Sequence, residues 1–162
     1  ARLARPGDPG GVDAGARGLT APVPDDAPVL LYDGACGFCA RSVRFVLARD
    51  REGGALRFAT LQGPVGAAAH RARPALAGID SVVWYEPAAG RVLVRSEAAL
   101  AVLRYLGGPW RALAAVGALV PRPVRDAAYA LVARNRHRLA GSADGCLLPT
   151  PAQRARFLDL PG

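Results

Sequence analysis

The chain has 162 residues, of which 21 are basic and 13 acidic, giving a formal charge of +8 at pH 7. About half of the residues (51%) are apolar, which predicts one folded domain with a buried core. The basic residues are all arginines, scattered along the chain with few aromatic neighbours, so we do not expect nucleic-acid binding. Three cysteines are too few for a disulfide framework that replaces a core.

The start of the chain and its apolar runs bear on localisation. Residues 1–27 are rich in Gly, Pro, Asp, Ala and Arg, which predicts a disordered leader. No basic-then-apolar signal is visible. The longest apolar run, residues 113–121, is far shorter than the roughly 20 residues that a transmembrane helix needs. We therefore expect a cytoplasmic protein, with contact to a membrane surface as a minor alternative.

The first predicted elements alternate between strand and helix. Residues 28–32 form an apolar run typical of a strand covered on both faces. Residues 40–50 are amphipathic at helical spacing, and the two cysteines just before this segment fall in the first helical turn. Residues 55–60 alternate as a second strand does, and residues 64–73 predict a short helix that ends before a proline.

A predicted hairpin and a closing helix complete a core over residues 28–106. Residues 81–86 and 91–95 are β-rich and are separated by a short turn, so they should pair antiparallel. Ser96 is placed to cap a helix that runs to about residue 106, with Glu97 in its first turn. The order βαβ–α–ββ–α predicts an α/β fold with a thioredoxin-like core of about four strands.

The remaining residues, 107–162, predict a helical extension packed on this core, so that the chain forms a single domain. Three helical segments are expected, at residues 110–119, 124–139 and 151–158. In the second of them, four apolar residues share one face: Val124, Ala128, Leu131 and Val132.

Two thiols in one helical turn predict dithiol–disulfide chemistry. The helix N-terminus favours the thiolate form of Cys36, which we expect to attack a disulfide, while the more buried Cys39 resolves the mixed disulfide. Between them, Gly37 lets the backbone approach a substrate, and Phe38 adds apolar surface. Such a pair needs no bound cofactor and no metal, and its substrate would be a protein or small-molecule thiol or disulfide. Asp33 either caps the turn before the helix or accepts a thiol proton.

Two alternatives use the same residues differently. The cysteines could belong to a zinc-binding or metal-delivering module, with Cys146 and His137 as further ligands, although no second close cysteine pair is present. The chain could also be a non-catalytic thioredoxin-like adaptor. Cys146 itself is interpreted as a buried apolar residue or as a resolving thiol for Cys36.

Two separated motifs resemble a known family. Asp33-x-x-Cys36-x-x-Cys39 after an apolar strand is similar to the signature of the DCC family of thiol–disulfide oxidoreductases. A second block is similar too, and consists of residues 126–129, residues 133–138, Gly141, Cys146 and Pro149. The resemblance covers residues 28–149 and implies a thioredoxin-like fold with dithiol–disulfide exchange.

The chain departs from thioredoxin at the loop that faces the cysteine pair. Where thioredoxins have a cis-proline, this chain has Asp80-Ser81, and a non-proline cis bond would cost about 3 kcal/mol, so we expect a trans bond. Asp80 and Ser81 are interpreted as strand-entry caps or as groups facing the thiols. Asn135 and Arg136 lie in an arginine-rich helix end, where they either complement the helix dipole or pack across the active site to stabilise a thiolate or an anionic substrate.

Overall fold

A computed structural model describes residues 27–50, 54–72, 74–76, 78–79, 81–140 and 149–159. Nearly all of the predicted leader lies outside the described residues, as do Asp80 and Cys146 and the side chain of His137.

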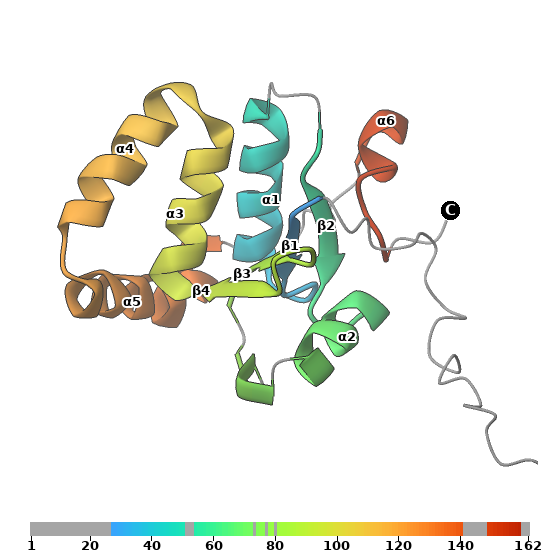
Figure 1. The fold of residues 1–162 in the computed structure, drawn as a ribbon, viewed down its shortest axis with the longest axis horizontal. Helices are drawn as coiled ribbons and strands as arrows, with labels where there is room; N and C mark the ends of the chain where they lie inside the picture. The colour runs from blue at the N-terminus through green and yellow to red at the C-terminus, as the bar shows by residue number, and fades with distance from the viewer. Residues whose placement is uncertain are drawn as a thin grey trace, which may run out of the picture.

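A mixed four-stranded sheet forms the centre of the fold (Figure 1). Its order is β2-β1-β3-β4, with bounds Arg57–Thr60, Val29–Tyr32, Val83–Glu86 and Arg91–Val94. β1 pairs parallel with β2, while the β1–β3 and β3–β4 pairs are antiparallel. The predicted α/β class, with a βαβ unit followed by a hairpin, is confirmed.

Helices cover both faces of this sheet. They are α1 (Gly37–Arg49), α2 (Pro64–Ala72), the 3-10 helix η1 (Pro74–Leu76), α3 (Arg95–Leu106), α4 (Gly108–Leu119), α5 (Arg122–Ala140) and α6 (Pro151–Arg154). Figure 1 shows α1 and α3 side by side, α2 on the opposite side of the sheet, α4 beyond α3, and α5 below the lower ends of α4 and α3. The predicted helical extension after the core is therefore present in α4 and α5.

The sequence of β1 explains how the two faces acquire separate cores. Successive strand residues point to opposite faces, so Leu30 and Tyr32 face one layer and Val29 and Leu31 the other. The first layer contains α1 and α3 and includes both cysteines of the predicted site. All four β1 residues are buried, at 5% exposure or less, which accounts for the uninterrupted apolar run.

Two predicted element boundaries are wrong. Ser96 does not cap α3, because the helix begins at Arg95, one residue before Ser96, and its N-cap residue is Val94. Instead, the buried Ser96 hydroxyl donates to Asp126 Oδ1 at 2.5 Å and ties α3 to α5. The final helix, expected over residues 151–158, ends at Arg154.

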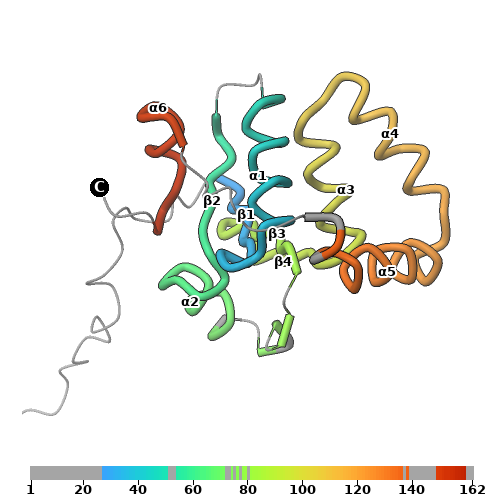
Figure 2. The backbone as a smooth tube through the Cα atoms, turned by 180° about the vertical axis from the view of Figure 1, so that it is seen from behind, coloured from blue at the N-terminus to red at the C-terminus, as the bar shows by residue number. Residues whose placement is uncertain are grey.

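After α6 the chain turns and then bonds to the outer edge of β2 at one bridge. The Phe58 N–H donates to the Arg156 carbonyl at 2.8 Å, and the Leu158 N–H donates to the Phe58 carbonyl at 2.9 Å. These bonds form an isolated parallel bridge between Phe58 and Phe157, and Figure 2 shows α6 at the β2 edge. The segment therefore covers an otherwise open sheet edge.

None of the described helices is long and apolar enough to cross a membrane. The apolar face predicted on α5 is largely exposed, since Val124, Leu131 and Val132 are 57%, 57% and 42% exposed.

Candidate active site

A tight turn after β1 places Cys36 at the start of α1. The Cys36 N–H donates to the Asp33 carbonyl at 3.2 Å, which closes a four-residue turn through Gly34 and Ala35. Cys36 has extended backbone angles and serves as the N-cap residue of α1. Its sulfur accepts a hydrogen bond from the Cys39 N–H at 3.4 Å. The predicted placement of both thiols in one helical turn is therefore present.

The local sequence favours an anion at this position. The first turn of α1 carries no acidic side chain, so its backbone N–H groups and the positive end of the helix dipole face the Cys36 sulfur without a competing charge from the helix. A protonated cysteine sulfur is a weak hydrogen-bond acceptor, whereas a thiolate sulfur is a strong one.

Both thiols are reduced and buried. Cys36 is 5% exposed and Cys39 4%, so the two residues are buried to nearly the same extent. Burial, together with the hydrogen bond and charge of the adjacent Cys36 sulfur, raises the pKa of the Cys39 thiol to about 12. Cys39 therefore holds its proton at neutral pH.

The Asp33 carboxylate is held by three partners. Its Oδ1 accepts hydrogen bonds from the Ala35 N–H and from Gln62 Nε2, both at 3.0 Å. Its Oδ2 lies 3.9 Å from a guanidinium nitrogen of Arg136 on α5, and both side chains are only 15% exposed. Asp33 thus caps the turn, as one of its two predicted roles requires, and also links the cysteine turn to α5.

Gln62 is a site residue that the sequence reasoning missed. Besides donating to Asp33, its Oε1 accepts from the Gly34 N–H at 3.2 Å, so it holds the turn from both sides. A signal was available, because Gln62 follows β2 just as Asp33 follows β1. Since these strands are parallel, their carboxyl ends meet at one edge of the sheet.

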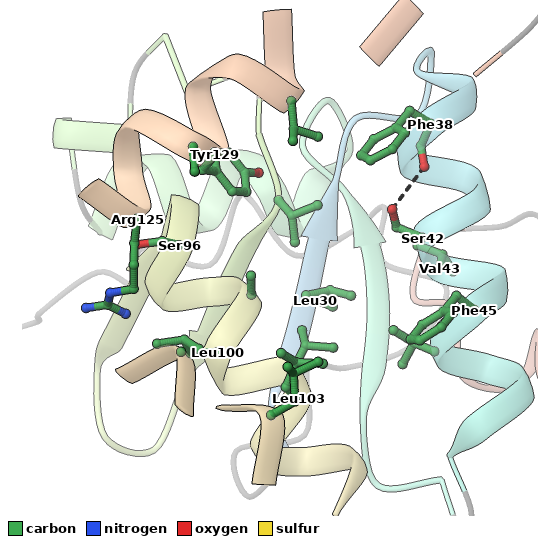
Figure 3. Close-up of a pocket in the computed structure, with 18 of the residues that line it drawn as sticks. Leu30, Phe38, Ser42, Val43, Phe45, Ser96, Leu100, Leu103, Arg125 and Tyr129 are labelled. Atoms are coloured by element: carbon green, nitrogen blue, oxygen red, sulfur yellow. Dashed lines mark hydrogen bonds between the residues drawn. The ribbon is translucent and has the colours of Figure 1, made fainter. Parts of the chain in front are cut away.

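An apolar cavity of about 730 Å³ begins beside the motif. Figure 3 shows it between α1 and α3, with Phe38 and Val43 on one wall, Leu100 on the other and Leu30 at the sheet. The Ser42 hydroxyl donates to the Phe38 carbonyl at 3.0 Å. Phe38, which was expected to supply apolar surface at the motif, therefore lines this cavity.

The other predicted site residues differ in where the structure places them. Ser81 and Arg136 line a second cavity of about 510 Å³, described below. The Asn135 side chain donates to the Leu131 carbonyl within its own helix, so Arg136 rather than Asn135 reaches Asp33. Among the described residues there is no cis peptide bond and no group of three or more possible metal-ligating side chains.

Comparison with known proteins agrees with this arrangement. Residues 30–142 match the DCC1-like thiol-disulfide oxidoreductase family. The chain belongs to this family. It is 39% identical over 131 residues to the uncharacterized protein YuxK of Bacillus subtilis (strain 168), which covers 80% of this chain and 93% of that protein.

A second relative comes from a plant. The chain is 37% identical over 125 residues to a chloroplastic DCC family protein of Arabidopsis thaliana, covering 76% of this chain and 71% of the relative. No solved structure matches the chain. The matched region of the family includes nearly the whole of β1, the cysteine turn and the whole of α5, the three elements that meet at Asp33.

Proposed function

We propose that this member of the family is a thiol–disulfide oxidoreductase that exchanges electrons through Cys36 and Cys39. The observation that carries the proposal is the position of the Cys36 sulfur at the N-terminus of α1, where it accepts the Cys39 N–H. A helix N-terminus favours the thiolate form of a cysteine, and the thiolate is the form that attacks a disulfide.

The reaction would proceed in two balanced steps. The Cys36 thiolate attacks one sulfur of a substrate disulfide, the substrate S–S bond breaks, and the leaving thiolate takes a proton from the medium. The Cys39 thiol then loses its proton and attacks the Cys36 sulfur, which releases the second substrate thiol. Two electrons pass from the protein dithiol to the substrate, and the protein retains a Cys36–Cys39 disulfide.

Electrostatics support this assignment of roles. The raised pKa of Cys39 keeps it protonated while Cys36 reacts first. Once Cys36 is part of a mixed disulfide, the coulombic and hydrogen-bond effects of its sulfur that raise the Cys39 pKa are weakened. Release of the Cys39 proton would then become easier at the step that needs it. Cys36 itself is only 5% exposed, but the turn residues Gly34 and Ala35 beside it are exposed, so a substrate would approach the sulfur over these two residues.

Trapping experiments test the proposal. Reduced Cys39→Ser protein should form a stable mixed disulfide with a small disulfide such as hydroxyethyl disulfide, because no second thiol can displace the product. Cys36→Ser protein should form none at neutral pH. Mass spectrometry of proteolytic peptides identifies the cysteine involved. Equal trapping at both cysteines would refute the division of roles.

The zinc alternative is decided in the same preparation. Native protein is analysed for metal as purified, and each cysteine is alkylated before and after reduction. A gain of alkylation at both Cys36 and Cys39 after reduction, without metal, agrees with the proposal. Stoichiometric zinc with both cysteines already reduced would refute it. A Cys36→Ser variant that keeps full biological activity would instead indicate an adaptor.

A further inference from the structure

A second cavity, of about 510 Å³, lies on the side of the site formed by α5 and the start of β3. Unlike the apolar cavity beside Phe38, it is lined by charged and polar side chains, which are Ser81, Arg95, Asp126, Tyr129, Arg134 and Arg136. Its volume lies in the range typical of small-molecule sites, about 300–1,000 Å³. Arg136 belongs to this cavity and also pairs with Asp33 at 3.9 Å, so the cavity adjoins the cysteine turn.

The charges around this cavity are unbalanced. Among the described residues, three arginines line it against one carboxylate, Asp126. That carboxylate is already engaged, since Oδ1 accepts from the Ser96 hydroxyl and Oδ2 lies 3.6 Å from Arg122. Arg134 makes no ion pair with any described residue. An anion entering the cavity would therefore meet the guanidinium group of Arg134, which no carboxylate of the described residues neutralises.

Two further observations point to a ligand in the same place. The Ser81 hydroxyl is buried and has no hydrogen-bond partner among the described residues, which costs free energy unless a partner is supplied. Arg95 has φ of 54°, a left-handed conformation that other described non-glycine residues do not adopt. Backbone strain of this kind gathers at binding sites, where it positions a side chain.

We propose that this cavity binds the carboxylate groups of a low-molecular-weight disulfide and presents its S–S bond to Cys36. The inference rests on the proposed function and names the substrate class for it. Guanidinium groups of Arg134 and Arg95 bind carboxylate oxygens through paired N–H donors, and the Ser81 hydroxyl donates to the same anion. Arg136, positioned between cavity and Asp33, draws the bound disulfide toward the cysteine turn. Reaction then follows the two steps given above and yields two thiols.

The test compares three disulfides of matched size and different charge. Reduced protein is mixed in single turnover with 3,3′-dithiodipropionate (anionic), hydroxyethyl disulfide (neutral) or cystamine (cationic), and thiol release is followed. We expect the second-order rate constants to fall in that order, with roughly tenfold between anionic and neutral, and the difference to shrink as salt is raised.

Variants assign this preference to the cavity. The anionic-to-neutral rate ratio should fall about fivefold in Arg134→Gln and a few fold in Ser81→Ala, the usual effect of removing one exposed charge or one hydrogen bond. Arg111→Gln is the matched control, because it removes an exposed arginine of α4 away from the cavity and should leave the ratio unchanged. Equal rates for all three disulfides in the native protein would overturn the proposal.

A non-reactive probe separates this proposal from the proposed function. Suberate has the length of 3,3′-dithiodipropionate but no sulfur, so calorimetry measures its binding without redox chemistry. We expect binding to the native protein that is weakened in Arg134→Gln. Absence of binding together with normal oxidation by hydroxyethyl disulfide would overturn the cavity alone. Binding of suberate without oxidation by any disulfide would overturn the proposed function and leave an anion site.

Discussion

Asp33→Asn isolates the charge of Asp33 from its shape. The asparagine side-chain oxygen can still accept from the Ala35 N–H and from Gln62, which bond Oδ1 at 3.0 Å. What disappears is the negative charge that faces Arg136 at 3.9 Å and lies one turn from Cys36. The variant therefore tests whether Asp33 acts on the thiols through its charge.

The size of the expected effect follows from the turn. Asp33 and Cys36 are its first and fourth residues, whose Cα atoms lie within about 7 Å in such turns. Two unit charges roughly 7 Å apart interact by about 1 kcal/mol at an effective dielectric constant of about 50. That energy corresponds to roughly 0.7 pH unit. The pH profile for alkylation of Cys36 should thus move by about that amount toward acid in Asp33→Asn.

Iodoacetamide, which is neutral, measures this profile without a charge effect of its own. The assay uses a Cys39→Ser background and counts modified Cys36 peptides by mass spectrometry. Arg136→Gln is the paired variant and should move the profile the opposite way, because it leaves Asp33 uncompensated. Unfolding in urea should show a loss of only about 0.5–1 kcal/mol for Asp33→Asn. An unmoved profile, or a shift of the same sign in both variants, would leave Asp33 a purely structural role.

Three further predictions concern stability. Gly66→Ala should destabilise α2 by several kcal/mol in urea unfolding, because the added Cβ would lie 2.2 Å from the Leu61 carbonyl oxygen. This steric cost exceeds the preference of alanine over glycine in a helix, which is about 1 kcal/mol. Gly117→Ala in α4 should be near neutral, because its Cβ would meet only a flexible leucine side chain at 3.0 Å. Reduced protein should lose stability from about pH 9 upward, because the folded state keeps the Cys39 proton to about pH 12 while the unfolded state releases it near pH 9. A Cys39→Ala variant whose unfolding free energy falls with pH at the same slope would contradict this. Tyr105→Phe should lower the unfolding free energy by about 1–3 kcal/mol in the same urea assay. The lost hydroxyl accepts a hydrogen bond from a backbone N–H at 2.9 Å and donates one to a buried carboxylate at 3.0 Å. An unchanged urea midpoint would show that solvent replaces both bonds.

Much of the fold could be predicted from local patterns in the sequence. The apolar run of β1 predicted a strand buried on both faces, and all four of its residues are buried. The turn at Pro87–Gly90 predicted an antiparallel hairpin, and β3 and β4 pair in that way. The two-residue spacing of Cys36 and Cys39 at a helix start predicted their common helical turn. Each of these predictions depends on residues close together in the chain.

Pairings between distant residues were less accessible. Arg136 was singled out only as a residue near the site, and nothing in helix periodicity indicates that it meets Asp33. Burial of Ser96 against Asp126 depends on how α3 and α5 cross, whereas the local sequence predicts a helix cap there. The local sequence also predicts a helix at Phe157, because it does not reveal that the backbone beside this residue bonds to an edge strand. Tertiary contacts override local preference at all three positions.

The pairing of Asp33 with Arg136 also explains how one turn can contain both an aspartate and a reactive thiol. A carboxylate beside a thiolate opposes its formation, while the N-terminus of α1 favours it. Arg136 offsets part of the carboxylate charge, and Gln62 and Ala35 take up its hydrogen-bonding capacity, so the carboxylate is held in the turn. α5, which belongs to the extension, is in this sense a part of the site.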